Sequence, residues 1–181
     1  MPIKISEITS TQNALVKSIV KLQTPKTRKE QKLILLDGDK TILGLIEDNT
    51  EFEYLFLKKE DVELGKIDKK TFDKIKTKEL IYVNDAILKK ISTVTTANSL
   101  VGVVKEPEID IKEILKLDRI AVLDGIKDAG NLGTIIRSAC AFSIEAIVLV
   151  NNCVDIYNPK TIRSSAQNMF KIPVVAGNLD L

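Results

Sequence analysis

A glycine-rich segment between residues 123 and 137 has residue types and spacing that are suited to chemistry. Its sequence is Leu-Asp-Gly-Ile-Lys-Asp-Ala-Gly-Asn-Leu-Gly-Thr-Ile-Ile-Arg, in which an apolar strand pattern ends and a helical pattern begins. Asn131 is expected to cap this helix, and Gly133 falls in its first turn. Because free N–H groups at strand ends and helix starts bind anions, the segment predicts a ligand site.

Arg137 is the residue of this segment with the clearest chemical potential. It falls among Ile135, Ile136, Ala139 and Phe142, on a helix that a flanking sheet is expected to bury. A guanidinium group in apolar surroundings needs a partner, and a functional role is one reason to keep it there. We therefore expect Arg137 to take part in the function.

The spacing of Gly125, Gly130 and Gly133 limits the kind of ligand. It matches neither the GxGxxG pattern of dinucleotide sites nor a P-loop, which disfavours dinucleotides and ATP. A tight turn between strand and helix would also explain the glycines without any ligand. A nucleotide- or phosphate-binding α/β protein stays open as a weaker alternative.

A second segment, residues 155–165, combines a strong helix start with positive charge. Asn158 is expected as the N-cap, and a proline follows it at the first helical position. Lys160, Arg163 and Lys171 have no acidic residue among them between Asn158 and Lys171, a local charge of +3. The patch is either a contact for a polyanion or a solvated helix surface.

The N-terminal part of the chain has a basic run between residues 17 and 32. Six basic residues stand there against Glu30 alone: Lys17, Lys21, Lys26, Arg28, Lys29 and Lys32. The run surrounds Pro25, in an expected loop, which makes Lys26, Arg28 and Lys29 candidates for contacts with phosphate groups. A solvated helix face is the plainer alternative.

Composition excludes several kinds of chemistry. None of the 181 residues is histidine, so the chain contains no Ser-His-Asp or Cys-His pair and no zinc site with an imidazole ligand. Cys140 and Cys153 form neither a CxxC pair nor a disulfide framework, which favours a reducing compartment. We expect a cytoplasmic protein with no metal and no membrane contact, since no apolar stretch is long enough to span a bilayer.

Two alternating α/β units are expected to position these residues. Residues 1–105 form the first unit, residues 106–117 a linker, and residues 118–181 the second unit. The first is expected to have helices over 15–22, 39–48, 68–76 and 85–91, and strands over 33–36, 52–57, 80–83 and 100–104. The second is expected to have strands over 120–123, 144–150 and 172–175, and helices over 131–142 and 159–170. Its apolar strands predict a parallel sheet covered on both faces.

The second unit resembles the SpoU (TrmH-like) branch of the SPOUT superfamily, the tRNA and rRNA ribose 2′-O-methyltransferases. Residues 123–142 resemble the family's first motif, with its Asn-x-Gly-x-x-x-Arg core. Residues 157–165, Tyr-Asn-Pro-Lys-Thr-Ile-Arg-Ser-Ser, and the later Phe-Lys-Ile-Pro-Val support this likeness. Small departures are Ser143, where the family commonly has glycine, and Gln167, where it has a small residue.

The first unit resembles the family's substrate-binding domain, which is similar to ribosomal protein L30e. The resemblance rests on Arg28-Lys-Glu, on residues 33–38 and on residues 99–107. The family's usual Glu-Gly pair is Asp37-Gly38 in this chain. The implied fold is therefore an L30e-like α/β domain followed by a SPOUT-type α/β domain.

The resemblance implies an RNA 2′-O-ribose methyltransferase that uses S-adenosylmethionine and acts on rRNA or tRNA. Arg137 would activate the ribose hydroxyl with help from the substrate phosphate, and Asn131 would orient Arg137 or the ribose. The implied substrate-binding residues are Lys26, Arg28, Lys29, Gly133, Asn158, Lys160 and Arg163.

The family's later motifs are not found in these 181 residues. They are a Gly-x-Glu-x-x-Gly loop and a segment rich in Ser and Asn, and they form most of the cofactor pocket and the knot. The resemblance therefore implies cofactor-binding residues beyond Leu181 and a catalytic domain that is truncated here. It implies a homodimer when that domain is complete. A catalytically inactive RNA-binding module is the alternative.

Overall fold

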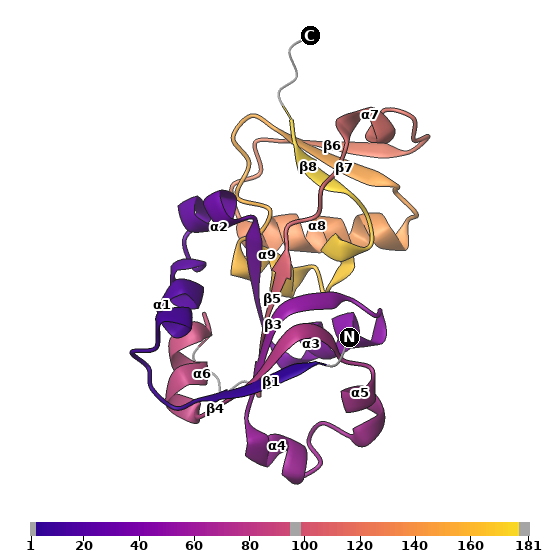
Figure 1. Cartoon of the computed structure of the whole chain (residues 1–181). Coiled ribbons are helices and arrows are strands. Elements are labelled where there is room, and N and C mark those ends of the chain that lie inside the picture. Colours follow the sequence, from indigo (N-terminus) through magenta and orange to yellow (C-terminus); the bar gives the residue numbers. More distant parts are fainter. Residues whose placement is uncertain (1–2, 95–98, 178–181) are drawn as a thin grey trace. The chain divides into compact units, whose positions relative to one another are not determined.

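The computed structural model describes residues 3–94 and 99–177 of the chain (Figure 1). These residues fall into two compact units, Met1–Glu106 and Pro107–Leu181. None of the helices within the described residues is long and apolar enough to cross a membrane.

A five-stranded mixed sheet forms the centre of the first unit, with the strand order β1-β4-β3-β5-β2. β4 is parallel to both β1 and β3, whereas β5 is antiparallel to β3 and β2. The strands are β1 (Lys4–Ile8), β2 (Leu33–Asp37), β3 (Glu51–Leu57), β4 (Lys76–Val83) and β5 (Leu100–Lys105). The sequence did not predict β1, an edge strand whose residues are mostly exposed and which therefore lacks an apolar pattern.

Helices follow most of these strands. They are α1 (Ala14–Lys21), α2 (Pro25–Gln31), α3 (Asp39–Glu47), α4 (Lys59–Glu63), α5 (Lys69–Asp73) and α6 (Asp85–Ile91). α1 and α6 bury Val16, Ile19 and Ile87 in one core with Phe56 of β3 and Val101 of β5. The helix predicted over 85–91 is confirmed.

The expected loop around Pro25 is instead the helix α2. Proline occupies its first turn, where the missing N–H costs no hydrogen bond, so Pro25 starts the helix. The helix predicted over 68–76 is shorter in the structure, because β4 already begins at Lys76.

The second unit contains a three-stranded parallel sheet in the order β6-β7-β8. Its elements are α7 (Ile111–Ile114), β6 (Ile120–Asp124), α8 (Ala129–Ala141), β7 (Ala146–Val150), α9 (Pro159–Ser164), the 3₁₀ helix η1 (Asn168–Phe170) and β8 (Val174–Ala176). The predicted parallel sheet is confirmed. The expectation that both faces are covered is wrong for the described residues, since Val122 in the middle of β6 is 53% exposed.

The prediction of one long helix over residues 159–170 is also wrong. α9 ends at Ser164, and Ala166 and Gln167 then take φ values of 48° and 63°. This left-handed backbone ends the helix before η1 begins. Neither residue is a glycine, so the sequence carries no signal for the break.

Candidate functional site

The two predicted ligand segments lie side by side at the carboxyl ends of β6 and β7. Asp124 and Val150, the last residues of these strands, are register partners. Asn151 Nδ2 donates a hydrogen bond to Asp124 Oδ1 at 2.8 Å, and the Val154 N–H donates to the Ile126 carbonyl at 2.7 Å. The two loops therefore meet at one edge of the sheet, which is where α/β proteins bind ligands.

Asp128, and not Asn131, caps α8. The Asp128 carboxylate accepts a hydrogen bond from the Asn131 N–H at 2.8 Å, which places Asn131 in the first turn of the helix. The sequence does contain a signal for this cap, because aspartate is as favourable as asparagine at the N-cap position. Asn131 is exposed at this edge of the sheet.

Lys160 is not a free cation of the predicted patch. Its Nζ lies 2.9 Å from Asp128 Oδ2, so an ion pair links the start of α8 to the first turn of α9. The Lys160 ammonium and the Asn131 N–H both lower the pKa of the Asp128 carboxyl. Any anion that binds Lys160 must therefore compete with this carboxylate.

Gly133 and Asn158 have structural explanations. A Cβ atom on Gly133 would lie 2.5 Å from both the Thr161 carbonyl oxygen and Ser164 Cβ, so the glycine allows α8 and α9 to touch. Gly133 is buried by α9, and the contact with substrate that was expected of it has no room in this structure. Asn158 caps α9 as predicted, accepting a hydrogen bond from the Lys160 N–H at 2.9 Å.

The expectation that Arg137 is buried among apolar side chains is wrong, because this residue is exposed. The buried stripe of α8 contains Leu132, Gly133, Ile136 and Ala139, which recur at helical spacing. Arg137 lies outside that stripe although its sequence neighbours are apolar. An exposed guanidinium can donate several hydrogen bonds to an anion.

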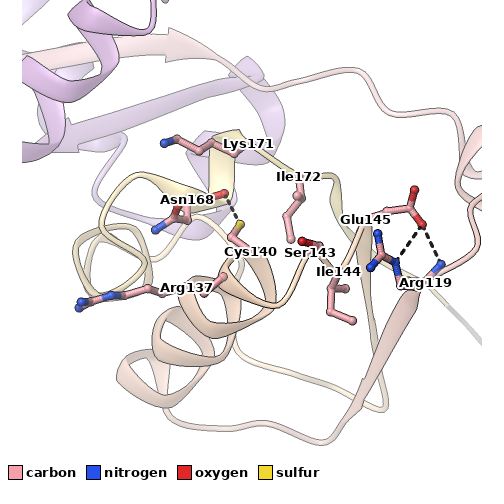
Figure 2. A pocket seen from close by; sticks show the side chains of 10 residues that line it. Arg119, Arg137, Cys140, Ser143, Ile144, Glu145, Asn168, Lys171 and Ile172 are labelled. Carbon is pink, nitrogen blue, oxygen red and sulfur yellow. Dashed lines mark hydrogen bonds and ion pairs between the residues drawn. The ribbon is translucent and has the colours of Figure 1, made fainter.

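Arg137 lines an open cavity of about 670 Å³, which we call the Arg137 groove (Figure 2). The groove lies at the amino ends of the strands, since Arg119, Glu145 and Ile172 each precede a strand. Its lining is Arg119, Arg137, Cys140, Ala141, Ser143, Ile144, Glu145, Asn168, Lys171 and Ile172.

Asn131 and Arg137 are therefore not brought together. They are six residues apart on α8, about 9 Å along the helix axis. Asn131 lies beside the glycine loops and Arg137 lines a groove at the other end of the strands. The expectation that Asn131 orients Arg137 has no contact to support it among the described residues.

The polar groups of the groove differ in their pairing. The Glu145 carboxylate accepts a hydrogen bond from the Arg119 N–H at 2.9 Å and lies 3.9 Å from the Arg119 guanidinium. Cys140 Sγ donates to the Asn168 carbonyl at 3.5 Å. Burial raises the pKa of the Cys140 thiol, an effect that the nearby Lys171 ammonium only partly offsets. The thiol thus stays protonated and is unsuited to act as a nucleophile.

The basic run of the first unit separates into one buried residue and several exposed ones. Arg28 is only 3% exposed, and its Nη1 donates to the Leu22 carbonyl at 2.7 Å. Its guanidinium thus supports the chain between α1 and α2, and the expected contact of Arg28 with substrate stays a prediction that this burial does not favour. Lys26 and Lys29 are exposed on α2, and Lys26 Nζ lies 4.0 Å from the exposed Glu30 carboxylate.

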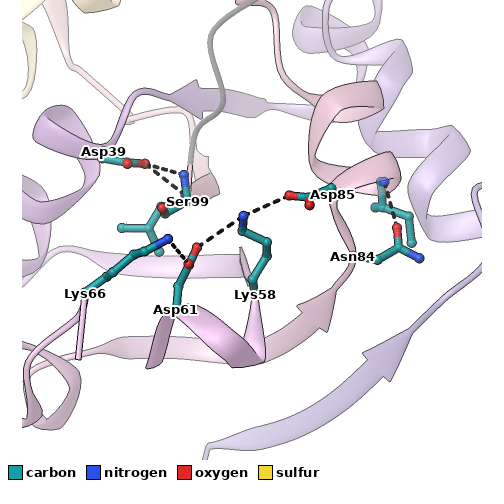
Figure 3. A network of polar contacts seen from close by, with 9 residues as sticks. Asp39, Lys58, Asp61, Lys66, Asn84, Asp85 and Ser99 are labelled. Atoms are coloured by element: carbon teal, nitrogen blue, oxygen red, sulfur yellow. Dashed lines mark hydrogen bonds and ion pairs between the residues drawn. The ribbon is translucent and has the colours of Figure 1, made fainter. Parts of the chain in front are cut away.

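The sequence did not predict a polar network around the buried Asp61 (Figure 3). Asp61 lies 2.6 Å from Lys66 Nζ and 3.7 Å from Lys58 Nζ, and Lys58 is also 2.8 Å from Asp85. Burial acts to raise the pKa of Asp61, but Lys66, Ser99 and Lys58 together lower it. Asp85 in turn raises the pKa of Lys58. Opposite charges thus keep the buried carboxylate ionised.

Two cavities of the second unit do not suit S-adenosylmethionine. The cofactor carries a positively charged sulfonium, and the Arg137 groove presents three cations against one carboxylate. A second cavity, lined by Tyr157, Phe170 and Pro173 among others, has about 210 Å³, less than the roughly 300 Å³ of typical ligand pockets. Within residues 3–94 and 99–177, no three Cys, Asp or Glu side chains are grouped to hold a metal ion.

Comparisons with known proteins match both units. Residues 118–180 match the SpoU rRNA Methylase family, and residues 13–102 match the MRM3-like substrate binding domain. The chain is 27% identical to the 23S rRNA (guanosine(2553)-2′-O)-methyltransferase RlmP of Bacillus subtilis, over 97% of this chain and 66% of that protein. It is 29% identical to the mitochondrial rRNA methyltransferase 3 of Xenopus tropicalis, over 90% of this chain and 40% of that protein.

Solved structures of the same kind share the fold. The AdoMet-bound rRNA methyltransferase from Sinorhizobium meliloti aligns with a TM-score of 0.79 at 26% identity, over 97% of this chain and 66% of that one. A structure described as an RNA 2′-O ribose methyltransferase aligns with a TM-score of 0.73 at 28% identity, over 96% of this chain and 66% of that one. The chain thus spans two thirds or less of the length of these proteins.

Proposed function

Because the chain belongs to the SpoU rRNA methylase family, we propose that it is part of an RNA 2′-O-ribose methyltransferase that acts on rRNA with S-adenosylmethionine. The main support is a structural alignment that includes both units: 97% of the chain aligns with an AdoMet-bound rRNA methyltransferase. The L30e-like character of the first unit, assembly as a homodimer and a cytoplasmic location belong to the same proposal.

In this proposal the first unit binds RNA through its exposed lysines. Lys17 and Lys21 on α1 and Lys26 and Lys29 on α2 are all exposed, whereas the acids of this part of the chain are few. Phosphate contacts of this kind position an RNA without reading its sequence. Among the basic residues between 17 and 32, Arg28 is the one that does not contribute to this surface, because it is buried.

Arg137 contributes positive charge to the reaction. A ribose hydroxyl is a poor acid, so methyl transfer depends on holding it in line and on stabilising the charge that develops. The exposed Arg137 guanidinium can bind the phosphate beside the reacting ribose and stabilise negative charge near it. S-adenosylmethionine would supply the methyl group when bound.

The residues beside the glycine loops are assigned to substrate positioning. Asn131 is exposed there, and Lys160 is held near it by Asp128. Arg163, on the same helix as Lys160, is half-buried. An RNA that approached this edge would meet these side chains.

A catalytically inactive RNA-binding module is the second candidate, favoured because neither the Arg137 groove nor the smaller cavity beside Tyr157 suits the cofactor. Fluorescence anisotropy with fragments of 23S rRNA and calorimetry with S-adenosylmethionine separate the two. Salt-sensitive RNA binding together with cofactor binding supports the methyltransferase. RNA binding without cofactor binding supports the module, and absence of RNA binding at low salt contradicts both.

A further inference from the structure

We propose that the Arg137 groove binds a phosphodiester of the RNA backbone, held between Arg137 and Lys171. The inference rests on the proposed function and deepens it. It places a phosphate contact away from the glycine loops and makes Lys171 a substrate-positioning residue. The chemical class of the ligand is a single-stranded stretch of RNA.

The geometry of the groove brings the two cations to one side. Arg137 comes from the exposed face of α8, and Lys171 directly follows η1. Asn168 and Cys140 lie between them and join η1 to α8 through the hydrogen bond from the thiol to the Asn168 carbonyl. In Figure 2 the nitrogen atoms of Arg137, Asn168 and Lys171 all point toward the same side.

The charges of the groove leave two cations for a ligand. Glu145, its one carboxylate, is paired with Arg119. Arg137 and Lys171 are exposed and form no ion pair with another described residue. A guanidinium offers a planar pair of donors to a phosphate, and an ammonium adds a compact positive charge, so together they suit one or two phosphate groups.

A neighbouring cavity favours RNA over an acidic peptide. The cavity of about 210 Å³ shares Lys171 and Ile172 with the Arg137 groove and is lined by Tyr157, Phe170 and Pro173. Aromatic rings next to a cation are the combination that single-stranded nucleic acids use, with a base on the ring and a phosphate on the cation. An acidic peptide has no bases to stack on these aromatic rings.

Lysine acylation of the full chain, read by mass spectrometry, tests the contact directly. Fragments of 23S rRNA should reduce acylation of Lys171 several-fold and leave that of Lys112, an exposed residue of α7, unchanged. Equal acylation of Lys171 with and without bound RNA overturns the inference. Protection of Lys171 by poly-glutamate as strong as that by RNA also overturns it, because the groove would then accept any acidic polymer.

A variant measures how much the same contact contributes to RNA affinity and to its salt dependence. Lys171→Ala should weaken RNA binding several-fold and lower the slope of log K against log salt by about 0.7, the value for one phosphate contact on a single strand. Lys112→Ala should change neither, and thermal melting should be the same for both variants. If Lys171→Ala keeps the wild-type affinity and slope, the inference is overturned but the proposed function is not. If the wild-type protein does not bind RNA, both are overturned.

Discussion

The carboxylates of Asp37 and Asp39 hold Thr93 and Ser99, which are six residues apart in the sequence. The Asp37 carboxylate accepts a hydrogen bond from the Thr93 N–H at 2.7 Å, and the Asp39 carboxylate accepts one from the Ser99 N–H at 2.9 Å. Gly38 between them has a φ of 101°, a conformation that favours glycine. The Asp-Gly-Asp turn at the end of β2 thus holds Thr93, which follows α6, and Ser99, which precedes β5.

Replacement of Asp39 by alanine should destabilise the first unit. The carboxylate also accepts the Leu100 N–H at 3.0 Å, so the change leaves two backbone donors without their acceptor. We expect a loss of about 1 to 3 kcal/mol, measured by urea denaturation. Asp48→Ala, at an exposed position of the same unit, is the control. Equal denaturation midpoints for the two variants would show that Asp39 does not hold β5.

The basic run should separate into a structural and a binding part. Arg28→Ala should cost about 2 kcal/mol of stability, because it removes a charged donor from a buried carbonyl. Lys26→Glu combined with Lys29→Glu should leave the melting temperature unchanged and weaken RNA binding with a shallower salt dependence. Unchanged RNA affinity across a salt series would return these lysines to an ordinary solvated helix face.

Gly133→Ala should be much more harmful than Gly130→Ala, although both residues lie in the first turns of α8. The added methyl group at 133 meets the backbone of α9 at 2.5 Å, whereas at 130 it meets the flexible ends of Asp128 and Lys160 at 2.9 and 3.0 Å. Overpacking at Gly133 should cost about 1 to 3 kcal/mol. Chemical denaturation measures both, and equal stabilities would contradict the close contact of α8 with α9.

Acidification should destabilise the first unit through Asp61. Its pKa in the folded protein lies below the ordinary value of 3.8, so its contribution to stability is present above that pH and is lost as the pH falls through the folded pKa. Asp61→Asn should lower stability at neutral pH and flatten the pH dependence in the acid range. Asp48→Asn, which lacks this network, should keep the wild-type dependence, and an equally steep curve for Asp61→Asn would contradict the assignment.

Local signals in the sequence predicted most of the elements. Asn158 does cap α9, and the apolar runs of β2, β3 and β7 are strands. These features depend on neighbouring residues, which the sequence shows directly. The linker expected over 106–117 stays a prediction, with α7 as its one described helix.

The side chains of the candidate site were harder to predict. Arg28 and Arg137 both stand in helices, yet the first is buried and the second exposed. Burial depends on which face of a helix packs against other segments. The partner of Arg28 is the Leu22 carbonyl, and the partner of the buried stripe of α8 is α9. The pairing of Lys160 with Asp128 joins residues 32 positions apart, and spacing in sequence carries no signal for it.

The central claim is that Arg137 serves an RNA 2′-O-ribose methyltransferase, and ribose methylation mapped in the cell tests it most directly. The gene that encodes this chain would be compared in three forms: wild type, deletion, and Arg137→Ala. The account predicts that deletion removes 2′-O-methylation at an rRNA position and that Arg137→Ala removes the same methylation while the protein level stays normal. Full methylation at every rRNA position in the Arg137→Ala cells would contradict the account.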